Sequence, residues 1–391
     1  FIILNKLMKN KEIILKYQEL KNKSGSHSPS LANIKEKIPE INIKVDACFL
    51  SNPYATDLFL KYFKKELINT GEINALLEFY PSQNHIIAGY VENQLELDKG
   101  NVFICNGAIE AIQAVIHRFT KEKILVIIPT FSSYYEYATP ENEVVYYKLK
   151  KDNNFKLDVE DYIKTVKEVK PNTIILINPN NPDGGYIKRN DLERIINELD
   201  WVENIIIDES FIHFAYENSE MRLQSIVPFV KDKNNVVVLK SMSKDFGIAG
   251  LRCGYAIMAK ERVTELLKNG YLWNSNGIAE YFFKLYSRKD FLSEYELVRR
   301  KYITESLFFI AELNQIRNIK IYPTRANFVL IELLNGLTAD DVSADLICNH
   351  GVYVRNCNDK IGLEGEFIRV AARSKEENKL ILKAIKYVAT T

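Results

Sequence analysis

Cysteine is scarce in this sequence of 391 residues, and no two cysteines stand at the Cys-x-x-Cys spacing of a metal or redox motif. The five that are present form an odd number and are scattered along the chain: Cys48, Cys105, Cys253, Cys348 and Cys357. This usage is typical of reduced thiols and argues against a disulfide framework or a zinc site. We therefore expect a cytoplasmic protein that binds no metal.

An excess of charge of one sign is also missing, because 52 Lys and Arg residues stand against 51 Asp and Glu residues. A strongly basic or acidic balance would favour nucleic acid or an anionic membrane surface as the partner. No stretch reaches the roughly 18 apolar residues that a membrane span needs. Asn5 and Lys6 interrupt the apolar start too early for a signal peptide. The sequence therefore favours a small-molecule ligand, with neither nucleic acid nor a membrane as a partner.

Short apolar segments alternate with helical patterns over most of the chain. These segments are nearly all apolar, as strands buried on both faces of a sheet should be. The alternation predicts an α/β fold with a mostly parallel central sheet flanked by helices. The predicted strands lie near residues 102–105, 124–128, 143–147, 173–177, 204–207 and 236–239.

The pattern changes near residue 270, where long amphipathic helical stretches begin and lead to strand-like segments near 319–322 and 327–331. A chain of this length with 47% hydrophobic residues can bury a large core and a smaller one. We predict an N-terminal arm over 1–50, which belongs to the small domain and covers the active site. A large domain over 51–275 and a smaller α+β domain over 276–391 follow.

The most informative run is Ser241-Met-Ser-Lys-Asp-Phe-Gly-Ile-Ala-Gly-Leu-Arg252, which follows the apolar segment Val236–Leu239. A lysine amine can form a Schiff base with an aldehyde cofactor. Ser241, Ser243 and Arg252 supply hydroxyls and a guanidinium for a phosphate group. The two glycines let the backbone pass close to a ligand. The full run suits pyridoxal phosphate, whereas a bare Ser-x-Ser-Lys match would more often hold a solvated surface lysine.

Asn106-Gly-Ala-Ile109 stands between a predicted strand and a predicted helix. Ligands of parallel α/β sheets bind at such points, outside the carboxyl ends of the strands. The amides of Ala108 and Ile109 could therefore meet a phosphate at the positive end of the helix dipole. An ordinary helix cap by the Asn106 side chain is the alternative.

Two further strand ends carry polar residues. Asn181, held in an extended conformation before Pro182, could direct its amide toward the phenolic oxygen of a bound ring; plain turn chemistry is the alternative. Asp208 follows the apolar segment 205–207 and could pair with a protonated pyridine nitrogen. As a purely structural residue, Asp208 would cap a helix.

In order and spacing, these motifs resemble those of the fold-type I pyridoxal-phosphate enzymes, and among them the histidinol-phosphate aminotransferase group and threonine-phosphate decarboxylase. The resemblance runs from about Asn52 to the C-terminus. It implies an aspartate-aminotransferase-like fold of type I, pyridoxal 5'-phosphate as the cofactor, and a homodimer.

The resemblance also implies a role for each motif residue. Lys244 would form the Schiff base, Asp208 would pair with the ring nitrogen, and Asn181 would contact the ring hydroxyl. Phe131 would stack on the ring and Tyr80 would reach the phosphate in the neighbouring subunit, although core packing for Phe131 and a simple loop aromatic for Tyr80 remain open. The phosphate group would be held by Ser241, Ser243, Arg252 and the amides of Ala108 and Ile109.

Three details resemble the decarboxylase more than the aminotransferases. Phe211 stands where the aminotransferases usually have a tyrosine. The C-terminal segments carry an additional arginine, and an arm histidine persists without its neighbouring glycines. Pairing of each arginine with a surface carboxylate, and a solvated histidine, are the alternatives. The predicted substrate-binding residues are His27, Asn52, Arg355, Arg369 and Arg373.

These details predict decarboxylation of a small O-phospho-amino acid, L-serine phosphate or L-threonine phosphate, to the phospho-amino-alcohol. Transamination of a phosphorylated substrate with glutamate is the alternative, since Lys244 is needed for either reaction. A pyridoxal-phosphate-binding regulator would need a DNA-binding module, and the sequence has no spare segment for one.

Overall fold

The computed structural model describes residues 2–390, with side chains described from residue 11 onward. The chain divides into two compact units, which are described in turn. The larger unit contains residues 51–181 and 185–303, and the smaller contains the residues up to 50, residues 182–184 and those from 304 onward. The domain limits expected from the sequence, after residues 50 and 275, stay a prediction.

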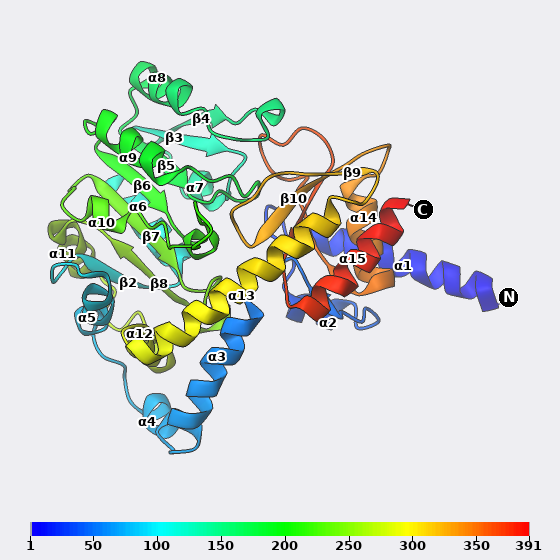
Figure 1. Cartoon of the computed structure of the whole chain (residues 1–391), viewed down its shortest axis with the longest axis horizontal. Coiled ribbons are helices and arrows are strands. Elements are labelled where there is room, and N and C mark those ends of the chain that lie inside the picture. Colours follow the sequence, from blue (N-terminus) through cyan, green and yellow to red (C-terminus); the bar gives the residue numbers. More distant parts are fainter. Residues whose placement is uncertain (1, 391) are drawn as a thin grey trace. The chain divides into compact units, whose positions relative to one another are not determined.

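A seven-stranded sheet forms the centre of the larger unit (Figure 1). The strand order is β2-β8-β7-β6-β5-β3-β4, and only β8 runs against the other described strands of this sheet. The mostly parallel α/β architecture is thus confirmed, whereas β8 was not expected. The strands are β2 (Val102–Asn106), β3 (Lys123–Ile128), β4 (Glu143–Lys148), β5 (Thr173–Ile177), β6 (Asn204–Asp208), β7 (Val236–Ser241) and β8 (Cys253–Ile257).

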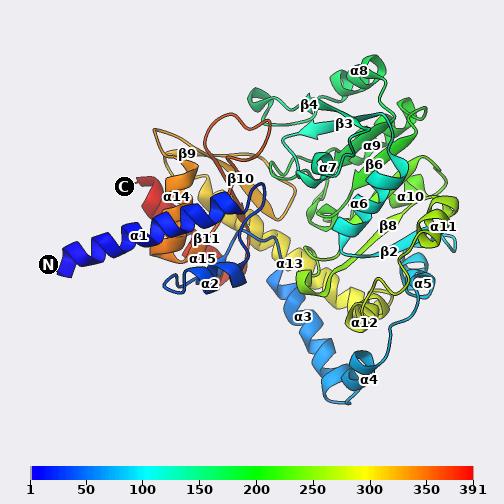
Figure 2. The same cartoon turned by 180° about the vertical axis from the view of Figure 1, so that it is seen from behind.

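Helices pack on this sheet, and Figure 2 shows α6 (Ala108–Phe119) lying across it. Ala111, Ile112 and Val115 of α6 join the buried cluster formed by the strands. Because these residues recur at helical spacing, one face of α6 is buried against the sheet. The other helices are α3 (Pro53–Phe63), α4 (Ile73–Glu78), α5 (Asn84–Leu95), α7 (Ser133–Glu136), α8 (Val159–Val169), α9 (Arg189–Glu198), α10 (Val227–Val230), α11 (Lys260–Lys268), α12 (Gly277–Tyr286) and α13 (Lys289–Leu313), which continues into the smaller unit from residue 304.

The smaller unit contains an antiparallel sheet of order β12-β13-β10-β9 and a short parallel pair, β1 with β11. Tyr17, Ile34 and Tyr353 belong to its buried cluster. Within the described residues, every helix is too short or too polar to cross a lipid bilayer. The elements are α1 (Ile2–Lys23), α2 (Leu31–Lys37), β1 (Val45–Asp46), β9 (Ile319–Ile321), β10 (Phe328–Leu333), α14 (Ala339–Asp345), β11 (Val352–Tyr353), β12 (Arg355–Asn356), β13 (Phe367–Ala371) and α15 (Lys375–Thr390).

Candidate active site

The loop that carries Lys244 connects the antiparallel strands β7 and β8. Ser241, the last residue of β7, lies opposite Gly254 of β8. The Met242 amide donates a hydrogen bond to the Cys253 carbonyl at 3.1 Å. These contacts close the loop at its base, so the positions of the residues between the two strands are restricted.

Asn52 holds the main chain of Lys244 from the other side. Its amide donates to the Lys244 carbonyl at 2.9 Å, and its side-chain oxygen caps α3 by accepting from the amides of Tyr54 and Ala55 at 3.1 and 3.4 Å. Asn52 is fully buried, and its Nδ2 has no hydrogen-bond partner among the described residues. An unpartnered buried amide nitrogen costs free energy. Asn52 therefore fits a residue that contacts a bound molecule.

Arg252 lies against the start of α6. A Cβ added to Gly107 would come within 2.3 Å of the Arg252 Nη2, so the guanidinium lies directly over this glycine. Gly107, with φ 76°, precedes α6, and no side chain caps this helix. The alternative of Asn106 as the helix cap is therefore wrong. An uncapped helix N-terminus next to a guanidinium suits a phosphate group.

Buried hydroxyls connect the lysine loop to the segment after β6. The Ser241 amide donates to the hydroxyl of Ser210 at 3.3 Å, and the Ser243 amide donates to the hydroxyl of Ser241 at 3.3 Å. All three serines are buried. The structure thus brings the predicted phosphate ligands Ser241 and Ser243 together and adds Ser210, which the sequence analysis missed.

Asp208 is the buried last residue of β6. The Tyr134 hydroxyl donates to its Oδ2 at 2.7 Å and the Ser210 amide donates to its Oδ1 at 2.8 Å. Burial raises the pKa of Asp208, while the hydrogen bonds from Ser210 and Tyr134 and the charge of Lys240 lower it. Phe211, not Asp208, precedes the short helix Ile212–Phe214, so the alternative role as a cap is wrong. The two donated hydrogen bonds hold the carboxylate at the end of β6, and its pairing with a ring nitrogen stays a prediction.

Tyr134 is a functional candidate that the sequence analysis missed. It is fully buried in the cluster beneath the sheet, and burial raises the pKa of its hydroxyl well above the ordinary value. The hydroxyl therefore stays protonated and can donate to Asp208. Its position three residues after Phe131 was visible in the sequence, but nothing in that pattern indicated a partner on a strand 74 residues away.

Hydrogen bonds of Asn180 connect the loop that contains Phe131 with the loop that contains Asn181. The Thr130 hydroxyl donates to the Asn180 Oδ1 at 3.1 Å, and the Asn180 Nδ2 donates to the Pro129 carbonyl at 2.9 Å. Phe131 packs against the core cluster and stays half-buried, and Asn181 is buried. Phe131 therefore does pack against the core. Stacking of its ring on the cofactor stays a prediction.

Tyr80 lies at the surface after α4, with 81% of its area exposed. Its ring stacks on Trp273, with centroids 4.9 Å apart. The described contacts of Tyr80 thus include an aromatic stack, and its predicted role toward a neighbouring subunit stays a prediction.

The predicted substrate arginines lie in the smaller unit. Arg355 donates to both carboxylate oxygens of Asp359 at 2.8 and 2.6 Å, and Arg373 lies 3.3 Å from the Glu377 carboxylate. These are the carboxylate pairings that the sequence analysis left open as the alternative. Arg369 donates to the main-chain carbonyl of Cys48 at 2.9 Å.

His27 lies in the exposed arm of the smaller unit. Its amide donates to the Ser24 carbonyl at 3.2 Å, and the carbonyl of the preceding residue, Ser26, accepts from Arg355 at 2.9 Å. The arm is therefore attached to the segment of Arg355 through Ser26. A role for the His27 ring in substrate binding stays a prediction.

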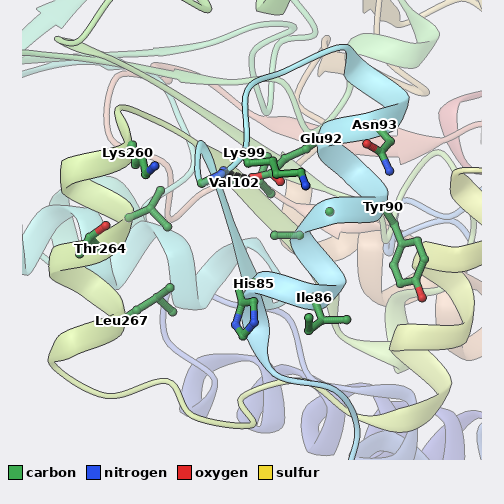
Figure 3. Close-up of a pocket in the computed structure, with 14 residues that line it drawn as sticks. His85, Ile86, Tyr90, Glu92, Asn93, Lys99, Val102, Lys260, Thr264 and Leu267 are labelled. Carbon is green, nitrogen blue, oxygen red and sulfur yellow. Dashed lines mark hydrogen bonds between the residues drawn. The ribbon is translucent and has the colours of Figure 1, made fainter.

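A pocket of about 570 Å³ lies elsewhere on the larger unit, between α5, the start of β2 and α11 (Figure 3). His85, Glu92, Lys99, Lys260 and Thr264 are among the residues around it. The Glu92 carboxylate accepts from the Gly100 amide at 2.7 Å, so it is already used within the protein. Of the described residues that line this pocket, none is a predicted site residue.

The chain belongs to the aminotransferase class I and II family, whose sequence model matches residues 51–385. It is 56% identical over 375 residues to an L-serine phosphate decarboxylase of Campylobacter jejuni, covering 96% of each chain. A solved structure of a decarboxylase from Sulfurospirillum multivorans covers 98% of this chain and 97% of that one, with 42% identity and a TM-score of 0.94. A histidinol-phosphate aminotransferase of Thermoanaerobacter is 32% identical over 293 residues, 73% of this chain and 77% of its own.

Family membership confirms the predicted fold type, and the enzymes of this family use pyridoxal 5'-phosphate. The residues present fit this cofactor. A guanidinium fills the space over Gly107, α6 begins without a side-chain cap, and an amide nitrogen of Asn52 is buried without a partner among the described residues. The roles of the individual residues stay predictions.

Proposed function

We propose that this protein is a pyridoxal-phosphate-dependent decarboxylase that converts L-serine phosphate and a proton to ethanolamine phosphate and CO2. The observation that carries this conclusion is the 56% identity, over 96% of both chains, to an L-serine phosphate decarboxylase. Identity to the aminotransferase named above is 32% over 73% of the chain. The predicted decarboxylase is thereby confirmed, and serine phosphate is favoured over threonine phosphate.

Residues of the larger unit would hold the cofactor. Lys244 would bind it covalently, and Arg252 with Ser241 and Ser243 would bind its phosphate. Asp208, oriented by Tyr134, would pair with the ring nitrogen. When bound, pyridoxal phosphate accepts the electron pair that remains when the substrate carboxylate leaves as CO2.

The orientation in which the protein holds the substrate would decide which bond at Cα breaks. Arginines that hold the phosphate of the substrate would fix this orientation, because positioning decides which bond can react. The Lys244 amine would then deliver a proton to Cα after the carboxylate has left. In the transaminase alternative, the same amine would remove the Cα proton instead.

Product analysis of the holoenzyme tests this function. With L-serine phosphate we expect equal amounts of CO2 and ethanolamine phosphate, with no requirement for a 2-oxo acid. L-Serine without phosphate is the control, and a much lower rate is expected for it. Accumulation of pyridoxamine phosphate without CO2 would sink the decarboxylase assignment in favour of transamination.

We also propose that the protein is a homodimer that pairs through an apolar surface of the larger unit. Exposed apolar side chains gather at the end of α4 and in the segments that follow α4 and α11, where Tyr80 stacks on Trp273 at 4.9 Å. Exposed apolar patches of this kind usually mark an interaction site. The patch residues are Leu77, Phe79, Tyr80, Leu272 and Trp273.

The second tryptophan provides a matched control for this interface. Trp273→Ser is expected to raise the dimer dissociation constant at least about tenfold, because buried aromatic anchors dominate interface energies. Trp201→Ser, which removes a similarly exposed tryptophan in the turn after α9, should leave it unchanged. Sedimentation equilibrium measures both variants. A monomeric wild-type protein at micromolar concentration would refute the proposed pairing.

The cytoplasm is the compartment that we propose for the protein. All five cysteines are free thiols, which suits a reducing environment. Fractionation of the source cells tests this location.

A further inference from the structure

A second pocket lies within the smaller unit, beside α15, which is red in Figure 1. It encloses about 440 Å³ and is bordered by α15, by the end of the π-helix Leu346–His350 that follows α14, and by the residue before β1. Pockets of this volume are typical of small-molecule sites, and π-helical turns are frequent at functional sites. Of the described residues around this pocket, none has a part in the proposed decarboxylation.

The described lining of this pocket is positively charged. It contains Lys44, Lys383 and Lys386, and it contains no Asp or Glu. All three lysines are exposed, and none of them has an ion-pair partner among the described residues. In a chain with 52 basic and 51 acidic residues, this is a local excess of one sign. Like charges that line a hollow surface attract anions to it.

The cations come from two separate segments that the fold holds in place. The Lys44 amide donates a hydrogen bond to the Gly351 carbonyl at 2.8 Å. Gly351 has a φ of 72°, and a Cβ added to it would lie 3.0 Å from the Lys44 Cγ and 2.4 Å from the Asn42 carbonyl oxygen. The glycine therefore lets the lysine stem lie close against this turn. Lys383 and Lys386 stand three residues apart on α15, so they are neighbours on the helix surface.

Aromatic and apolar side chains form another part of the lining. Tyr387 follows Lys383 by about one helical turn and is 57% exposed. The ring of His350 packs against the Tyr387 ring, with centroids 5.1 Å apart. Leu380, also exposed, lies one turn before Lys383. An exposed aromatic ring beside several amines can stack on a flat ring while the amines bind phosphate groups.

We propose that this pocket binds a nucleoside polyphosphate, with its phosphates on Lys44, Lys383 and Lys386 and its base on the ring of Tyr387. A row of phosphates offers several negative charges that separate ammonium groups can share. An acidic peptide would pair with the lysines but would not need the aromatic ring. The pocket shares no residue with the predicted cofactor and substrate sites, so the inference goes beyond the proposed function and does not depend on it.

Binding of metal-free ATP to the holoenzyme tests the pocket by isothermal titration calorimetry, with excess ethanolamine phosphate present to occupy the substrate site. We expect Lys383→Gln/Lys386→Gln to weaken ATP binding at least about tenfold, because two exposed ion pairs are lost together. Lys379→Gln removes an exposed lysine of α15 that does not line the pocket, and it should change the affinity less than about twofold. CO2 release from L-serine phosphate should be unchanged in both variants.

Variants of Tyr387 separate the base from the phosphates. Tyr387→Leu should weaken ATP about fivefold or more, through lost stacking, and leave the affinity for inorganic tripolyphosphate unchanged. Tyr387→Phe keeps the ring and should bind both probes within about twofold of the wild type.

Three outcomes would overturn the proposal: no ATP binding by the wild type at millimolar concentration, wild-type affinity in the double lysine variant, or equal affinity of the wild type for ATP and tripolyphosphate. ATP binding that depends on these residues, without CO2 release from L-serine phosphate by the wild type, would refute the proposed function alone.

Discussion

Lys244→Ala is expected to abolish CO2 release and the visible absorption band of the lysine-bound cofactor. The reason is covalent, because alanine has no amine that can attach the cofactor or deliver a proton to Cα. We expect kcat to fall on the order of 10⁴-fold or more, as for other residues that serve as a covalent attachment point. The structure indicates that the loop itself survives the change, since Asn52 and Cys253 hold it through main-chain contacts.

Two controls separate loss of the amine from loss of charge or fold. Lys244→Arg keeps a positive charge but provides no amine for the covalent bond, so it should match Lys244→Ala. Lys231→Ala removes an exposed lysine of the same unit and should leave the band and the rate unchanged. A visible absorption band that persists in Lys244→Ala would contradict the assignment of the cofactor lysine.

The second large effect is expected on stability, at the buried ion pair of Lys240 and Asp245. Both side chains are nearly inaccessible, and the Asp245 carboxylate also lies 3.3 Å from the Nδ1 of His213. Burial and the charge of Arg299, both of which persist without Lys240, lower the pKa of His213, so its ring supplies no replacement charge at neutral pH. Lys240→Met leaves an unpaired buried carboxylate and should lower the free energy of unfolding by about 3–5 kcal/mol. Urea denaturation measures this loss.

The double variant Lys240→Met/Asp245→Leu is the matched control for the ion pair. Replacing both partners with apolar residues of similar size removes the unpaired charge, so most of the lost stability should return. A double variant as unstable as Lys240→Met would show that packing, not charge, causes the loss.

The same variant should show a characteristic dependence on pH. Burial already raises the pKa of Asp245 in the wild type, and loss of Lys240 raises it further. Between the pKa of the unfolded chain and this higher value, the folded variant binds more protons than the unfolded chain, so its stability falls as pH rises. The stability difference from the wild type should therefore be smaller at about pH 5.5 than at about pH 8. An equal difference at both pH values would contradict the role of Asp245.

The pattern of apolar residues along the sequence predicted most strands of the larger sheet. Continuous apolar segments predicted six strands of the larger sheet, and five of them are largely buried, as strands covered on both faces should be. The sixth, β4, lies at the edge of the sheet and is mostly exposed or half-buried. The apolar segments did not predict β8. This strand, Cys253–Ile257, begins directly after Arg252, so no turn residues separate it from the run that carries Lys244. The antiparallel direction of β8 depends on pairing with β2 and β7, which the local sequence does not encode.

Site residues could be predicted from the sequence where they stand in a short, characteristic run. Contacts between residues of distant segments could not be predicted in this way. Lys244, Asp208 and Arg252 stand in recognisable runs. Tyr134 of α7 donates a hydrogen bond to Asp208 of β6, 74 residues further along the chain. Lys360 and Arg355 share the Asp359 carboxylate and the carbonyl of the distant Ser26 as partners. Such contacts follow from tertiary structure, so spacing along the chain could not show them.

The closed lysine loop also restricts how this protein can evolve. Ser241 and Gly254 are paired at its base, so the number of residues between them sets where Lys244 and Arg252 lie. An insertion or deletion there would displace one relative to the other, or turn the side chains of β8 to the opposite face of the sheet. Loops at the other end of the strands have no such restriction. Insertions and deletions can therefore be tolerated in those loops. The loop between Ser241 and Gly254 is expected to keep its length and to vary only by substitution.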